Sequence, residues 1–117
     1  MERYEALILI QENLDSIVDY LHQLKAKIEP EFRRKGFSVF DVGVDVVETA
    51  TRGSIDYTIK VYGEHNCALS AHEVSEAVKT ADPNYKGRVG VICGATPYPV
   101  ESVLNLQLLE DMKRAKS

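Results

Sequence analysis

The side chains best suited to metal chemistry lie close together in the middle of the chain. They are two imidazoles, one thiol and two carboxylates: His65, His72, Cys67, Glu64 and Glu73. Imidazole nitrogen and thiolate sulfur are ligands that zinc prefers, so this segment could bind zinc if it folded back onto itself. Its spacing, however, fits no closed zinc-site pattern. His65, Cys67 and His72 are therefore the metal candidates, and we expect no bound metal and no cofactor.

Nucleophilic catalysis finds less support in the sequence. Ser70 precedes Glu73 by three residues, which is the pattern of a helix-capping box and favours a structural role for its hydroxyl. Cys67 and Cys93 lack CxxC spacing and an activating neighbour, so we expect two reduced thiols. No Gly-x-Ser-x-Gly or phosphate-binding loop occurs. We expect no catalytic residue, so the chain is more simply a non-enzyme.

A basic group of residues could bind phosphate or RNA. Its members surround the end of the first expected helix: Lys25, Lys27, Arg33, Arg34 and Lys35. The same cations could instead neutralise the carboxyl end of that helix. The formal net charge is -4, which speaks against a protein that mainly coats nucleic acid.

Length and composition predict one globular domain spanning residues 1–117. A chain of 117 residues with 44% apolar and 27% charged residues can build one core and is too short for two. No apolar run approaches the roughly 20 residues that cross a bilayer, and no signal peptide is recognisable. We expect a cytoplasmic protein that does not enter a membrane.

The first expected secondary-structure element is a helix with a long apolar repeat. Seven aliphatic residues recur at alternating steps of three and four: Leu7, Ile10, Leu14, Ile17, Leu21, Leu24 and Ile28. This heptad spacing predicts one helix over residues 4–29, which Pro30 should kink or end before Gly36 stops the helical run. An alternative makes residues 4–10 a strand and lets Asn13 cap a shorter helix. Ile8 and Leu9 favour that alternative because both lie off the heptad seam.

The remaining elements follow from shorter patterns. Alternation at residues 40–46 and 55–62 predicts a β-hairpin, and Ser70 should begin a helix that ends at Asp82. Residues 88–94 are apolar on both faces and predict an interior strand. The tail from 101 to 114 could be strand or helix, and its composition favours helix.

The expected class is α+β with two layers, in the order α-β-β-α-β-α, with helices on one face of a small mixed sheet. A ferredoxin-like β-α-β-β-α-β order is the alternative.

Several short segments of the chain resemble segments of a known family and follow one another in the same order. They are Gly36-Phe37, Phe40-Asp41-Val42, Ile59-Lys60-Val61-Tyr62, Leu69-Ser70 with Glu73-Val74-Ser75, and Ala81-Asp82-Pro83. This stretch covers about half the chain and resembles the N-terminal domain of RimP-type ribosome maturation factors. Where that family has Ser-Pro-Gly-x-x-Arg-Pro, this chain has Cys93-Gly94-Ala95-Thr96-Pro97. The resemblance implies an accessory module that binds RNA or the ribosome.

Three hypotheses about function follow. The first is a non-catalytic adaptor or assembly protein that binds protein partners and forms homo-oligomers through Leu7, Ile8, Ile10 and Leu14. A straight helix of 26 residues would be about 39 Å long, which is more than a domain of this size can cover. The second is the RNA- or ribosome-binding module that the resemblance implies, with nucleic acid meeting the Lys25 to Lys35 group. The third is a small metal-dependent or Cys/His enzyme.

Overall fold

The computed structural model describes residues 2–48, 53–63, 69–93 and 103–116. Along the chain the elements are α1 (Glu2–Glu12), α2 (Leu14–Lys35), β1 (Phe40–Glu48), β2 (Gly53–Gly63), α3 (Ala71–Ala81), β3 (Arg88–Cys93), β4 (Val103–Asn105) and α4 (Leu106–Lys116). The α+β class and the order α-β-β-α-β-α are confirmed, with the short strand β4 added and the first helix divided in two. The ferredoxin-like order needed a strand at residues 4–10, where the structure has a helix.

The strands form one mixed sheet in the order β3-β2-β1-β4. The predicted hairpin is β1 with β2, paired antiparallel from Phe40 opposite Val61 to Glu48 opposite Gly53. After β2 the chain passes through α3 and returns as β3, which lies parallel to β2. The prediction of an interior position for β3 is wrong, because in the described part of the chain this strand has a neighbour on one side only.

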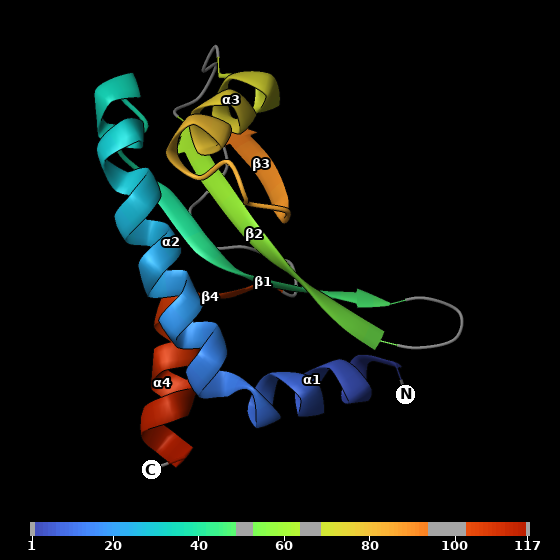
Figure 1. Cartoon of the computed structure of the whole chain (residues 1–117). Helices are drawn as coiled ribbons and strands as arrows, with labels where there is room; N and C mark the ends of the chain where they lie inside the picture. The colour runs from blue at the N-terminus through green and yellow to red at the C-terminus, as the bar shows by residue number, and fades with distance from the viewer. Residues whose placement is uncertain (1, 49–52, 64–68, 94–102, 117) are drawn as a thin grey trace.

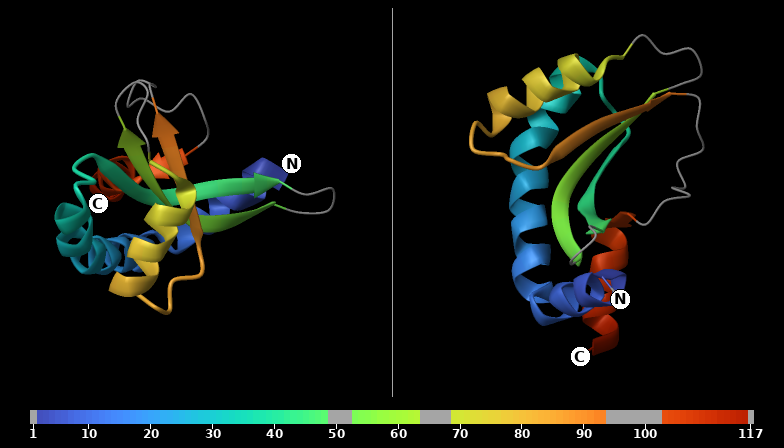
Figure 2. Two further views of the ribbon diagram at one scale, coloured as in Figure 1. Left: turned by 90° about the horizontal axis from the view of Figure 1, so that it is seen from above. Right: turned by 90° about the vertical axis from the view of Figure 1, so that its right-hand side faces the viewer.

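All four helices lie on one face of the sheet, as Figures 1 and 2 show. The apolar face of the hairpin is fully buried beneath them, at Val42, Val44, Ile59 and Val61. Helix α2 runs along the sheet and contacts α3 and α4, while α1 lies under the hairpin. One continuous core therefore joins the helices to the sheet, and the heptad residues from Ile10 to Ile28 belong to it.

The first helical segment bends at Asn13, where the sequence predicted a single helix. Asn13 is the N-cap of α2, and its side-chain amide donates to the Leu9 carbonyl at 2.9 Å. An asparagine amide competes with the helical hydrogen bonds around it, which makes this a favourable place to interrupt a helix. The bend turns α1 beneath the hairpin, so that Ala6 and Ile10 are buried there. Residues 4–10 are thus helical, and α2 begins directly after Asn13.

Helix α2 continues past Pro30 to Lys35, so Pro30 does not end it. The last turn is held in place by Phe32, which is fully buried and lies edge-on to Phe37 and Phe40 at centroid distances of 5.4 and 5.0 Å. Burying such rings offsets the backbone hydrogen bond that proline cannot make. Gly36 stops the helix as predicted, with a left-handed φ of 84° and a backbone N–H that bonds back to the Arg33 carbonyl.

Helix α3 matches its prediction closely. Ser70 is its N-cap, and the hydroxyl accepts a hydrogen bond from the backbone N–H of Glu73 at 3.1 Å. Val74, Ala77 and Val78 are buried on its inner face. Helix α2 and strand β3 of the same chain contact this helix.

The ambiguous tail contains both predicted structures in succession, the strand β4 and the helix α4. Strand β4 pairs with β1 only at Gly43, Val44 and Asp45. A Cβ atom on Gly43 would lie 2.3 Å from the Leu104 carbonyl oxygen, so β4 can approach this closely only because position 43 is glycine. Helix α4 then packs against α2, with Leu109 fully buried between them.

Candidate functional site

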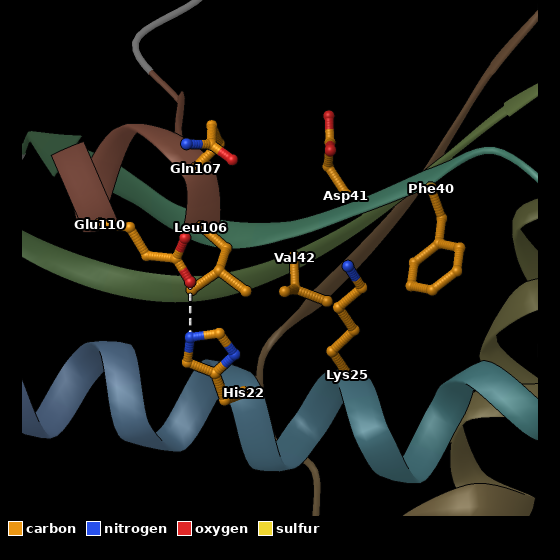
Figure 3. A pocket seen from close by; sticks show the side chains of 8 residues that line it. All are labelled: His22, Lys25, Phe40, Asp41, Val42, Leu106, Gln107 and Glu110. Carbon is orange, nitrogen blue, oxygen red and sulfur yellow. Dashed lines mark ion pairs between the residues drawn. The ribbon is translucent and has the colours of Figure 1, made fainter.

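A cavity of about 260 Å³ opens where β4 stops, between α2, β1 and α4. We call it the β1 groove, and Figure 3 shows its lining: His22, Lys25, Phe40, Asp41, Val42, Leu106, Gln107 and Glu110. Its floor is the first part of β1, and its walls come from helices that are far apart in the sequence. The groove gathers four titratable side chains at one edge of the sheet.

The charged groups of the groove fall into one ion pair and two side chains without a partner. His22 Nε2 lies 2.5 Å from Glu110 Oε1, which joins α2 to α4 across the groove. Lys25 and Asp41 have no ion-pair partner among the described residues. Figure 3 places Lys25 on the α2 side of β1 and Asp41 on the opposite side. The groove therefore offers a cation on one face of the sheet edge and an anion on the other.

Sequence reasoning did not single out His22, Gln107 or Glu110. His22 and Lys25 are three residues apart on α2, which places them on one helix face, but nothing in the sequence indicates that α4 lies opposite that face. The pairing of α2 with α4 depends on how both helices pack on the sheet. Asp41 lies on the side of β1 that points away from α2.

A second surface of interest lies on α1. Leu7, Ile8 and Leu9 have 38%, 36% and 39% of their area exposed, and we call these three residues the α1 apolar surface. Of the other residues expected to mediate self-association, Ile10 and Leu14 are buried in the protein's own core. Two other large apolar residues, Val39 and Leu108, are exposed at separate positions. The α1 apolar surface is the one place in the described chain where three such residues adjoin.

The basic group around the end of α2 is largely paired with acids. Arg33 Nη2 lies 3.1 Å from Glu29 Oε1, and Arg34 Nη2 lies 2.5 Å from Glu31 Oε1. The hydrogen bond from Arg34 lowers the pKa of Glu31. These carboxylates offset the charges that would meet a phosphate backbone.

Lys27 belongs to the same group and faces a buried acid. Its Nζ lies 4.0 Å from Oδ1 of Asp82, a carboxylate at the end of α3 that is only 6% exposed. Of the five basic residues, Lys25 lines the β1 groove, and Lys35 lies beside His72, Glu73 and Glu76.

The metal candidates are mostly outside the described residues. His65 and Cys67 lie there, while His72 is an exposed residue in the first turn of α3. The described part of the chain contains no group of three or more potential metal ligands. Cys93 is disulfide-bonded, so the prediction of a reduced thiol is wrong for this residue. Reduced thiols would have supported the expected cytoplasmic location, and the disulfide removes that support.

Comparison of the chain with protein-family models, with curated proteins and with solved structures finds no match. The resemblance to RimP-type factors therefore stays a prediction. Among the described residues, no helix is both long and apolar enough to span a membrane.

Proposed function

We propose that this protein is a non-catalytic assembly or adaptor protein that binds protein partners and self-associates through the α1 apolar surface. The observation that carries the proposal is the composition of α1. Ala6 and Ile10 are buried under the hairpin, while Leu7, Ile8 and Leu9 are exposed on its other sides. The apolar run of residues 6–10 thus covers more of the helix surface than the hairpin can bury, and adjoining exposed apolar side chains are typical of an interaction site.

A second copy of the chain is the partner we favour, arranged about a two-fold axis that places two α1 helices side by side. Helix α1 has 11 residues and is therefore about 16 Å long. Its exposed side is much smaller than the roughly 800 Å² per partner of a standard stable interface. We therefore expect a reversible dimer whose population rises with protein concentration.

Light scattering coupled to gel filtration tests this proposal over a wide range of concentrations. Leu9→Glu places a charge in the α1 apolar surface and should give a monomer at every concentration. Leu108→Glu is the matched control, since Leu108 is 45% exposed on α4 and lies outside that surface. The wild type and the control should both dimerise. A wild type that stays monomeric throughout contradicts the proposal, as does a Leu9→Glu variant that dimerises like the control.

A further inference from the structure

Strand β3 forms one margin of the sheet (Figure 1), and the ladder beside it sets the direction of its backbone groups. The Tyr62 backbone N–H donates to the Val39 carbonyl oxygen at 2.9 Å, so residues 39 and 62 face each other as a hydrogen-bonded pair of β1 and β2. Such pairs alternate along an antiparallel ladder. In the register of this hairpin, the backbone groups of Ile59 and Val61 therefore point away from β1 and toward β3.

Strand β3 presents two residues to the outside of the sheet. In the parallel register Gly90 lies level with the gap between Ile59 and Val61, so its N–H and C=O point toward β2. Backbone direction alternates along a strand, and the N–H and C=O groups of Val89 and Val91 therefore point away from β2. In the described part of the chain no strand lies on that side, and no backbone group bonds to either valine there.

This outer edge of β3 lacks the features that usually protect an exposed strand. From Val89 to Ile92 the sequence contains no charged residue and no proline, and the register with β2 runs without a bulge. Natural proteins use charges, prolines and bulges to keep sheet edges from pairing with other chains. An edge without them is a template for one more strand, which is how several domains bind extended peptides.

We infer that the outer edge of β3 binds an extended segment of a protein partner, which adds a strand to the sheet beside β3. The added strand runs antiparallel to β3, because antiparallel pairs are slightly more stable than parallel ones. Val89 and Val91 each form a hydrogen-bonded pair with one residue of the segment. Only the choice of a protein as partner rests on the proposed function, since β3 and the α1 apolar surface share no residue.

The side chains around the edge define the segment further. Val89 and Val91 are half-buried against the core, so aliphatic residues of the partner fit beside them. On the other face of the sheet Gly90 leaves open space, where the nearest atom to an added Cβ would be Lys60 Cγ at 3.9 Å. An aromatic side chain fits across such an edge glycine. Lys86 is exposed just before β3 without an ion-pair partner among the described residues, which favours an acidic residue at the end of the segment.

Amide hydrogen exchange of the isotope-labelled full chain is the experiment, with and without a capped peptide. The probe is Thr-Val-Tyr-Val-Thr-Glu, an ordinary strand length, which sets its valines opposite Val89 and Val91 and its tyrosine opposite Gly90. In the free protein the amides of Val89 and Val91 should exchange fast and that of Gly90 slowly. At about nine-tenths saturation the two valine amides should exchange about tenfold more slowly, since only the unbound tenth of the molecules is open.

N-methylated peptides separate strand addition from other kinds of binding, because each lacks one backbone donor. Methylation of either peptide valine removes an N–H that faces β3 and should weaken binding about tenfold. Methylation of the peptide tyrosine is the matched control, because its N–H faces away from β3 and should leave binding unchanged. If all the methylated peptides bind alike, whether tightly or weakly, the inference is overturned.

A protein variant tests the same edge from the other side. Val91→Pro removes an outward N–H and leaves the bonds between β2 and β3 in place, so it should abolish peptide binding in a chain that still unfolds cooperatively in urea. Val91→Thr keeps both the N–H and the branched side chain and is the matched control, which should bind like the wild type. Equal binding by the two variants contradicts the inference.

Two results would overturn the inference outright. One is slow exchange of the Val89 and Val91 amides without peptide, which would mean that the edge is already covered by this chain or by a second copy. The other is unchanged exchange of both amides at millimolar peptide. Leu9→Glu should leave the titration as it is, so failure here is distinguishable from failure of the dimer.

Discussion

Helices α1 and α3 have the same length of 11 residues and both pack on the sheet, yet their sequences differ in kind. Helix α3 begins at a capping serine and divides cleanly into a buried apolar side and an exposed polar side. Helix α1 shows no such division, because three of its large apolar side chains stay exposed beside the buried Ile10. The apolar side of α3 is covered within one chain, whereas α1 keeps three large apolar side chains exposed, which the dimer we propose would cover.

The largest expected loss of stability comes from truncating a buried side chain of α1 or α3. In this respect the two helices should behave alike. Ile10 and Val74 are both fully buried in the common core. Ile10→Ala should lower the free energy of unfolding by about 3 kcal/mol, and Val74→Ala by about 2 kcal/mol, because each leaves a cavity that the neighbours fill only in part. Urea denaturation of the two variants measures both values. A loss below about 1 kcal/mol for Ile10→Ala would show that α1 is not packed under the hairpin.

A smaller loss of stability is expected from removing the N-cap residue of α3 or of α2, and the loss should differ between the two helices. The Ser70 hydroxyl caps α3 by accepting from the Glu73 N–H, whereas Asn13 makes no side-chain cap bond to α2. Ser70→Ala should therefore lower the free energy of unfolding by about 1 kcal/mol. Asn13→Ala removes only an exposed hydrogen bond to the Leu9 carbonyl and should cost less than half as much. Thermal denaturation of both variants tests this order, and equal losses would contradict it.

The last expected effect on stability concerns the far end of α3 and depends on pH. Tyr85 follows α3, and its hydroxyl donates to the Arg88 carbonyl at 2.7 Å. Burial and nearby Tyr20, Asp56 and Asp45 raise the pKa of Tyr85, so its neutral form is favoured in the folded state. This contribution is present below the ordinary tyrosine pKa of about 10 and is lost as the pH rises through the raised folded value.

Tyr85→Phe tests that linkage because it keeps the ring and removes the hydroxyl. The variant should be less stable than the wild type at neutral pH by about 1 kcal/mol. The difference in stability should shrink above a pH of about 10, the ordinary tyrosine pKa. Only the wild type has a Tyr85 hydroxyl proton to lose, and its loss destabilises the folded state. Urea midpoints measured at several alkaline pH values give the comparison. A difference that stays constant with pH would contradict the assignment.

The sequence by itself determined the elements whose causes are local. Ser70 with Glu73 specified the start of α3, and Gly36 specified the end of α2, because both act through backbone groups within a few residues. Strict alternation predicted the hairpin, since only one register buries Val42, Val44, Ile59 and Val61 together. The helical nature of residues 4–10 followed from the apolar spacing.

Only the tertiary structure decided the features that depend on which elements meet. The bend at Asn13 exists because α1 gains contacts beneath the hairpin, and α2 passes Pro30 because Phe32 is buried against Phe37 and Phe40. The β1 groove likewise needs His22 on α2 and Glu110 on α4 to meet beside β1. Local propensity carries no information about such contacts, because their free energy arises between side chains that are distant in sequence and close only after folding.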